Sequence, residues 1–312
     1  MTLDLDGLIP AIVLPMREGG EPDEAALRRY VAWISEQGPV ALAVNVDTGE
    51  GPHLTHQEKM RVLEVVKEET GLPCIAGVAG PFTAAAVQQA RDFKSVGADG
   101  LLVFPIPAYL SSPLDPRIPL DYHRAIAEVG LPLILFQLQP ALGGVNFDTG
   151  TLRQLIDIDG VVAMKEASFD ARRYVDTVRM VQAHPKHRSG QFTMLTGNDN
   201  FILESFMLGC TGALIGFGAV MTREQVTMIE AWRGGKIDEA KLLGARVQHL
   251  ADAVFAAPVA NYRARLKESL VMLGVLDEAH VRPPLLPIPD HERQQLREAL
   301  LAVGLLKDGS AT

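Results

Sequence analysis

The chain has few cysteines, no excess of basic residues and no long apolar run. It carries 29 lysines and arginines against 38 aspartates and glutamates, a formal net charge of −9, so a nucleic-acid surface is not expected, since that needs a clustered basic face. No apolar run approaches the roughly 20 residues that a membrane-spanning helix requires. Cys74 and Cys210 are the only cysteines and lie far apart in apolar segments. Together with the absence of a signal peptide, this predicts buried free thiols and a cytoplasmic location.

The chain also lacks the short motifs of several chemistries. It has no C-x-x-C, H-E-x-x-H, P-loop or G-x-S-x-G pattern, so metal-dependent hydrolysis, phosphoryl transfer and serine-hydrolase chemistry have no support. The eight histidines show no metal-ligand spacing; pairs such as His53 and His56 are typical of solvated loops. We therefore expect no metal and no organic cofactor.

What the chain does contain is a repeated alternation of apolar strand and amphipathic helix. Eight such units of roughly 25–35 residues fit a closed (β/α)8 barrel, an α/β fold of the TIM-barrel type, because continuous apolar strands imply a parallel sheet covered by helices. A doubly wound open sheet is the competing architecture, but no glycine fingerprint follows the first strand. The strands are expected at residues 8–15, 40–46, 73–79, 100–104, 132–137, 161–165, 192–196 and 212–215.

From about Lys236 onward only helical patterns remain, over 237–255, 259–273 and 291–303. We interpret these as a helical extension packed on the barrel. The expected organisation is a catalytic barrel over residues 1–234 and a C-terminal helical extension over 235–312.

One strand ends on a lysine. Lys165 follows four apolar residues, Val161 to Met164, and a lysine in a buried strand loses hydration unless it pairs or gives up its proton. A neutral lysine amine is a nucleophile that condenses with ketones to form an imine. The alternative is an ordinary ion pair with a nearby carboxylate, such as Glu166.

Other polar groups stand at strand ends, which converge on the active site of a barrel. They are the turn Asp47-Thr48-Gly49-Glu50, Gln137, and the segment Thr196-Gly197-Asn198-Asp199. The turn and the segment after strand seven each have a structural alternative, because Asp and Thr also bond backbone N–H groups in turns and helix caps. A lysine surrounded by hydroxyls, amides and apolar walls is nevertheless the arrangement that an imine-forming enzyme needs.

In this order, these segments resemble the dihydrodipicolinate synthase / N-acetylneuraminate lyase family, over nearly the whole chain. The motifs that carry the resemblance are Thr48-Gly49-Glu50, Gly97-Ala98-Asp99-Gly100, Val161 to Ser168 with its Lys-Glu-Ala, Gly197-Asn198-Asp199 and Val281 to Pro287. The resemblance implies a barrel with C-terminal helices, usually assembled as a homotetramer, in which Lys165 forms a Schiff base with pyruvate or another 2-oxo acid. It also implies that Thr48, Gly49 and nearby backbone N–H groups receive the substrate carboxylate.

The sequence departs from that family pattern in several places. Phe136 stands where the family has a strand-five tyrosine that relays protons, and Asp47 replaces the first threonine of its turn. The family's tyrosine pair after strand four is replaced by Ile106-Pro107, although Tyr109 follows. The arginine that grips a second carboxylate in the synthase branch is absent from Pro140 to Gly144. The missing arginine argues against a true dihydrodipicolinate synthase.

Two hypotheses follow from these departures. Asp47 supplies the acid/base function that Phe136 lacks, through a water molecule, and Tyr109 reaches the site and orients the distal part of the substrate. We further expect Phe136 to contact the substrate, Gln137 to bond substrate hydroxyls and Leu214 to form an apolar wall.

The leading prediction is a Schiff-base lyase, an aldolase or dehydratase, acting on a 2-oxo acid such as pyruvate or a 2-keto-3-deoxy acid. Its expected partners are the small-molecule substrate and other copies of the chain, in a dimer or tetramer. One rival is a barrel that keeps the lysine but has lost turnover and serves as a binding or regulatory protein. Another is a phosphate-binding isomerase that uses Gly216 and Gly218 after strand eight.

Overall fold

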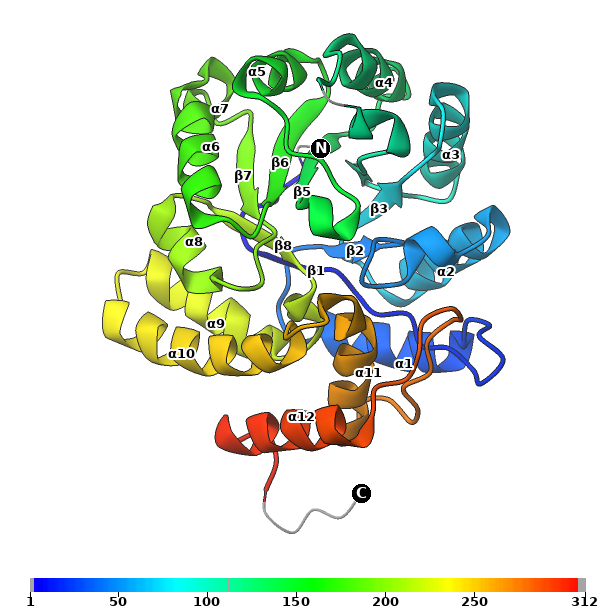
Figure 1. Ribbon diagram of the computed structural model, residues 1–312, viewed down its shortest axis with the longest axis vertical. Coiled ribbons are helices and arrows are strands. Elements are labelled where there is room, and N and C mark those ends of the chain that lie inside the picture. The colour runs from blue at the N-terminus through cyan, green and yellow to red at the C-terminus, as the bar shows by residue number, and fades with distance from the viewer. Residues whose placement is uncertain (1–2, 112, 308–312) are drawn as a thin grey trace.

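The computed structural model describes residues 3–111 and 113–307, and eight parallel strands form its centre (Figure 1). The strands pair in the order β1-β8-β7-β6-β5-β4-β3-β2. Backbone hydrogen bonds from Val40 to Leu8 (3.0 Å) and from Ile12 to Ala43 (3.1 Å) close the ring between β1 and β2. The predicted (β/α)8 barrel is therefore confirmed. Its strands are β1 Leu8–Pro10, β2 Leu42–Val44, β3 Cys74–Val78, β4 Gly100–Val103, β5 Leu133–Leu138, β6 Val161–Ala167, β7 Thr193–Thr196 and β8 Gly212–Ile215.

Helices surround the strands and then continue into a C-terminal group. Those around the barrel are α1 Glu24–Ser35, α2 His56–Glu69, α3 Thr83–Ser95, α4 Arg117–Ala127, α5 Thr149–Asp157, α6 Ala171–Ala183, α7 Pro185–Arg188, α8 Ile202–Leu208 and α9 Thr222–Arg233. The C-terminal group is α10 Ile237–Val254, α11 Tyr262–Met272 and α12 Asp290–Ala302. Short 3₁₀ turns lie between them: η1 Gly51–His53, η2 Pro107–Leu110, η3 Pro140–Leu142, η4 Phe217–Ala219 and η5 Val259–Asn261.

The strands are apolar on both faces because each face contacts a different part of the core. Along β5, Ile134 and Phe136 point into the barrel, whereas Leu133 and Leu135 point outward to the helices. This alternation places every second residue of a strand inside the barrel. The same rule decides which side chains at the strand ends reach the functional site.

The element boundaries differ from the sequence prediction where proline and capping chemistry act. β1 ends at Pro10 rather than extending to residue 15, and beyond it Ala11 makes only an isolated parallel bridge with Ala43. α4 begins at Arg117 instead of Asp121, because Pro119 falls in its first turn, where no intrahelical donor is lost. β6 continues two residues past Lys165, to Ala167.

Helix starts follow their capping residues closely. The side chain of Asp23 accepts from the N–H of Ala26 (3.0 Å) at the start of α1. Thr55 and Glu58 form a reciprocal capping box at the start of α2. Such caps bind backbone donors that have no partner within the helix.

Both cysteines are buried and free, as predicted. Burial raises the pKa of each thiol to about 12, so neither is a reactive thiolate near neutral pH. Within the described residues, no helix is both long and apolar enough to cross a bilayer.

The C-terminal helices are fixed to the barrel through the turn that follows β2. Glu50 and Lys267 of α11 form an ion pair (2.5 Å) in which both side chains are fully buried. The other carboxylate oxygen of Glu50 accepts the N–H of Arg282 (2.8 Å), and Lys267 also donates to the carbonyl of His280 (2.7 Å). The turn expected to bind substrate is therefore held from the side by the C-terminal segment.

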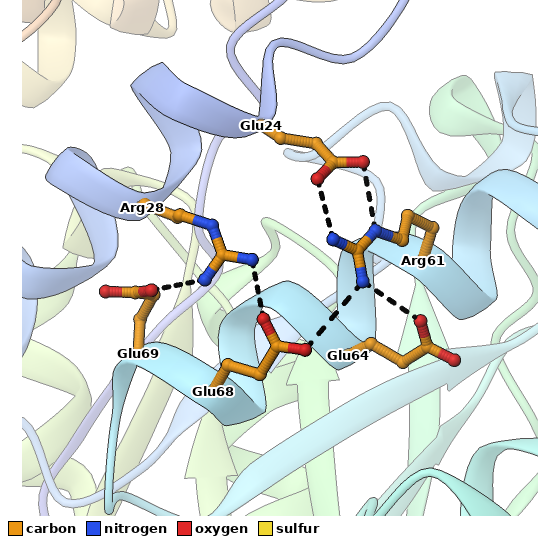
Figure 2. Close-up of polar contacts among 6 residues, drawn as sticks. All are labelled: Glu24, Arg28, Arg61, Glu64, Glu68 and Glu69. Atoms are coloured by element: carbon orange, nitrogen blue, oxygen red, sulfur yellow. Dashed lines mark hydrogen bonds and ion pairs between the residues drawn. The ribbon is translucent and has the colours of Figure 1, made fainter.

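Figure 2 shows a network of charged residues that joins the outer faces of α1 and α2. Arg61 of α2 makes a two-pronged contact with Glu24 of α1 (2.8 and 3.0 Å), and Arg28 of α1 donates to Glu68 of α2 (2.5 Å). The members of the network are Glu24, Arg28, Arg61, Glu64, Glu68 and Glu69.

We expect Arg61→Met to lower the midpoint of urea unfolding slightly at low ionic strength. The loss should shrink toward zero at about 1 M salt, because exposed charges are screened over a few ångströms there. Arg117→Met is the matched control, since among the described residues Arg117 forms an ion pair only with Asp115, two residues away. A midpoint change that is equally large at low and high salt would show that the network acts through packing instead.

Candidate active site

The site is built around Lys165, which lies on the inner face of β6. Lys165 is aligned with Phe136 of β5 on one side and with Leu195 of β7 on the other. All three residues point into the barrel, near the carboxyl ends of their strands. In a (β/α)8 barrel this is the face that carries the active site.

A pocket opens above Lys165. It is formed by the ends of β2, β5, β6, β7 and β8, together with residues from the C-terminal segment. Its lining residues are Val46, Asp47, Thr48, Phe136, Leu138, Leu142, Lys165, Ala167, Phe169, Gly197, Asp199, Gly216, Phe255 and Tyr262. The wall is mostly apolar with a few convergent polar groups, which is typical of a small-molecule site.

Gly197 makes room for the lysine side chain. A Cβ atom at this position would lie 2.6 Å from Cε of Lys165 and 2.7 Å from Cβ of Ala167. Contacts this short do not occur between real Cβ atoms and their neighbours. Only glycine at this position allows Lys165 to extend into the pocket.

The Lys165 amine loses its proton more readily than an ordinary lysine amine. Burial lowers its pKa to about 8, while the negative charges of Asp199 and Asp47 act in the opposite direction. Nζ lies 4.3 Å from the centroid of the Phe136 ring, a contact that also favours the ammonium form. Desolvation outweighs all three, so a fraction of the amine is available as a nucleophile at neutral pH.

Lys165 and Glu166 do not form the ion pair that was the alternative to a catalytic lysine. Adjacent strand residues point to opposite faces, so Glu166 lies outside the barrel when Lys165 lies inside. Glu166 instead accepts hydrogen bonds from Asn198 (2.8 Å) and Gln137 (3.2 Å).

Asp199 belongs to the polar segment after strand seven, for which the sequence left open a place in the active site or a role as a helix cap. It lines the pocket with Lys165, and burial raises the pKa of its carboxyl to about 7, against the opposing charge of Lys165. Its Oδ1 accepts the N–H of Phe217 (2.8 Å), just after β8. Its position just after the carboxyl end of β7 is the sequence feature that indicates a place in the active site.

Asp47 is held between two residues of the C-terminal segment. Its Oδ2 accepts the hydroxyl of Tyr262 (2.7 Å), and its Oδ1 is paired with the Arg263 guanidinium (2.5 Å). Arg263 also donates to the backbone carbonyl of Asp47 (2.8 Å). The Thr48 hydroxyl lies 3.5 Å from that of Tyr262.

Tyr262 and Phe255 were not anticipated from the sequence. Their rings stack with centroids 4.9 Å apart and close one side of the pocket. Both belong to the C-terminal segment, where the helical pattern alone gives no sign of contact with the barrel mouth. Gly216 lies against them: a Cβ there would come within 3.1 Å of Oγ1 of Thr48 and 3.2 Å of Phe255.

Four predicted substrate-binding residues do not line the pocket. Gln137 points out of the barrel, where its Oε1 accepts the N–H of Phe147 (3.2 Å), because the strand alternation turns it away from Phe136. Leu214 lies inside the barrel but deeper, and Gly49 is packed against the backbone of Ile12. Tyr109 is buried in an aromatic group with Tyr122, His123 and Phe147.

Of the predicted site residues, the structure thus brings together Lys165, Asp47, Thr48 and Phe136. The roles assigned to them, and the role assigned to Tyr109, stay predictions. In the described part of the chain, no group of three or more His, Cys, Asp or Glu side chains is arranged to hold a metal ion.

Comparison with known proteins supports the resemblance drawn from the sequence. The sequence model of the protein family described as "Dihydrodipicolinate synthetase family" matches residues 4–303 of this chain. A 4-hydroxy-tetrahydrodipicolinate synthase from Acidiphilium cryptum is 31% identical over 303 residues, covering 96% of this chain and 99% of the relative. That from Gluconacetobacter diazotrophicus is 29% identical over 302 residues, 96% of this chain and 97% of its own.

A solved structure shares the fold over the same span. It is a chloride-inhibited dihydrodipicolinate synthase from Acinetobacter baumannii complexed with pyruvate, 26% identical, with a TM-score of 0.84. The match covers 97% of this chain and 100% of that one. The family predicted from the sequence is confirmed.

Proposed function

The chain belongs to the dihydrodipicolinate synthetase family, whose members are class I lyases that act through a lysine Schiff base, and from this premise we propose that it acts on pyruvate or another 2-oxo acid. Lys165 is the nucleophile. The observation that carries the proposal is its buried amine, with a pKa of about 8, at the mouth of the barrel. At pH 7, about one amine in ten is then neutral, against roughly one in several thousand at the ordinary lysine pKa.

We place the substrate carboxylate at the turn after β2. Thr48 lines the pocket and is buried. A carboxylate held there brings the adjacent keto carbon toward Lys165. The relative from Acinetobacter baumannii, which is complexed with pyruvate, supports this class of substrate.

The pocket restricts the rest of the substrate, beyond the 2-oxo acid group, less closely. Among the described lining residues, Lys165 is the one cationic side chain, and the segment Pro140–Leu142 takes the place of the expected arginine. This favours a partner without a second carboxylate, such as an aldehyde or the sugar-like end of a 2-keto-3-deoxy acid. The names of the relatives do not support excluding synthase activity, so aldehydes with and without a carboxylate belong in the same substrate screen.

The phosphate-binding alternative is not favoured. The backbone N–H of Phe217, which would face a phosphate after β8, is bound to the Asp199 carboxylate. We propose a cytoplasmic enzyme that assembles as a dimer or tetramer, as the family resemblance implies. Light scattering on the purified protein measures the assembly directly.

The test is reductive trapping with pyruvate and borohydride. We expect one stable adduct per chain, located on Lys165 by peptide mass mapping. Because only the neutral amine attacks, the initial rate of imine formation should rise about tenfold from pH 6 to pH 7 and level off above about pH 8.

Incubation with borohydride alone provides the control for unspecific reduction. An adduct on other lysines, or none at any pH, would rule out the Schiff-base proposal. A rate that keeps rising to pH 10 would mean that the Lys165 amine has an ordinary pKa in solution.

A further inference from the structure

Imine formation moves protons, and β5 supplies no group to move them. The attacked carbonyl oxygen must leave as water, so it gains two protons that come from other atoms. The residue of β5 beside Lys165 is Phe136, whose ring has no proton to give. A donor must therefore come from another part of the pocket.

The only phenol among the described lining residues is Tyr262, at the start of α11. Its hydroxyl lies 2.7 Å from Oδ2 of Asp47 and 3.5 Å from Oγ1 of Thr48. Asp47 in turn acts electrostatically on Lys165. The hydroxyl thus lies between the residue expected to hold the substrate carboxylate and a carboxylate that influences the nucleophile.

Tyr262 is rigidly placed and stays protonated until it reacts. Its ring stacks on Phe255 and lies under the Arg263 guanidinium, whose central carbon is 5.0 Å from the ring centroid. Burial and the neighbouring Asp47 raise the pKa of the Tyr262 hydroxyl well above 10. The proton is therefore present at neutral pH.

We propose that Tyr262 is the catalytic residue that transfers protons during imine formation at Lys165, that Asp47 accepts and returns a proton through it, and that Arg263 positions Asp47. This inference rests on the proposed Schiff-base function. It replaces the water molecule of the earlier hypothesis for Asp47, because the Tyr262 hydroxyl occupies Oδ2 and the Arg263 guanidinium occupies Oδ1.

The first step forms the carbinolamine. Nζ of neutral Lys165 bonds to the keto carbon, and the carbonyl π electrons move to oxygen, which leaves nitrogen positive and oxygen negative. Nitrogen gives a proton to Tyr262 as Tyr262 gives its own to Asp47. The reverse transfer then delivers a proton to the substrate oxygen, and both residues return to their starting state.

The second step removes water. Tyr262 donates its proton to the carbinolamine hydroxyl, the carbon–oxygen bond breaks, and the nitrogen lone pair forms the iminium double bond. Tyr262 recovers a proton from the carbon next to the iminium carbon, which leaves the enamine. Two protons reach the departing oxygen, one from nitrogen and one from carbon, and no outside acid is consumed.

Other groups in the pocket are less suited to this role. Oδ1 of Asp199 is engaged by the Phe217 N–H, and among the described residues no side chain is hydrogen-bonded to Asp199 that could complete a proton relay. Among the described residues, the Thr48 hydroxyl is hydrogen-bonded only to Tyr262, so it has no separate acceptor for a proton. Tyr109 packs among aromatic rings rather than along this pocket.

The experiment compares Tyr262→Phe and Asp47→Asn with the unchanged protein in single-turnover imine formation with pyruvate, stopped by borohydride at timed intervals. We expect the rate constant at saturating pyruvate to fall about 10²-fold or more in each variant. Because Lys165 is still present, the final extent of labelling should remain one per chain. Phenylalanine preserves the stacking on Phe255, and asparagine preserves an acceptor for the hydroxyl without accepting its proton.

Tyr174→Phe is the matched control, because Tyr174 is equally buried and its hydroxyl donates to the carbonyl of Ser205 (3.2 Å) outside the pocket. It should label at the unchanged rate. Unchanged rates in Tyr262→Phe and Asp47→Asn, with the parent protein labelled normally, would overturn the relay and leave the Schiff-base function intact. Absence of labelling in the parent protein would instead refute the proposed function, and the relay with it. If Tyr262→Phe does not fold, the rate of Asp47→Asn decides the question.

Discussion

Replacing Lys165 with methionine should abolish turnover while leaving the protein folded. Methionine fills a similar volume but offers no nucleophile, and the loss should reach about 10⁴- to 10⁶-fold in kcat, as for other enzymes that lose a catalytic nucleophile. Borohydride with pyruvate should then give no adduct at any pH. The measurements are steady-state turnover of whichever substrate the screen identifies and the mass of the intact protein after trapping.

Stability should move in the opposite direction to activity in this variant. The folded state lowers the pKa of Lys165 to about 8, so below that pH the folded protein bears the cost of a buried ammonium that the unfolded chain does not. Between about pH 8 and pH 10.5 the unfolded chain binds more protons, and the stability of the parent protein therefore rises with pH there. At pH 7, Lys165→Met should melt at the same temperature as the parent protein or higher.

Lys59→Met is the matched control for this experiment. Lys59 on α2 is as little exposed as Lys165, at 8% each, and burial lowers its pKa too, but it does not line the pocket. Its removal should leave trapping and turnover unchanged. If Lys165→Met still turned over substrate, or if Lys59→Met lost the adduct, the nucleophile would have been assigned to the wrong residue.

The sequence was sufficient to predict the barrel because each strand is bounded by turn residues and carries side chains apolar on both faces. Val161 to Met164 is typical: four consecutive apolar residues, preceded by Gly160, predict a strand. Lys165 stood out for the same reason, since a cation inside such a strand needs an explanation. Both inferences depend on local pattern alone.

The sequence could not predict which way the side chains at the strand ends point, or which residues far apart in the chain come into contact. Gln137 and Lys165 both lie near the carboxyl ends of their strands, yet one points out of the barrel and the other into it. This depends on a register that is set by pairing between strands. Tyr262 reaches the pocket because α11 folds back across the turn after β2, more than 200 residues earlier in the chain. No periodicity within α11 encodes that contact, although the family resemblance could predict the fold around it.

The buried pair Glu50 and Lys267 gives the second large expected effect. Removal of either partner alone leaves the other charge without a partner in a site that excludes water. Glu50→Gln or Lys267→Met should therefore destabilise the protein by about 3–5 kcal/mol. Burial lowers the pKa of Lys267 and the charge of Glu50 raises it, so without Glu50 the amine should lose its proton more readily.

The double variant Glu50→Gln with Lys267→Met removes both charges but keeps side chains of similar size. It therefore separates the effect of the ion pair from the effect of packing. Because no unpaired charge remains, its loss in the free energy of unfolding should be smaller than the sum of the two single losses. Urea unfolding of the parent protein, both single variants and the double variant measures this coupling. Exposed Asp115 and Arg117, treated in the same way, should show no measurable coupling. Additive losses at Glu50 and Lys267 would mean that the ion pair contributes nothing beyond packing, and that the turn carrying Thr48 is held to α11 by other contacts.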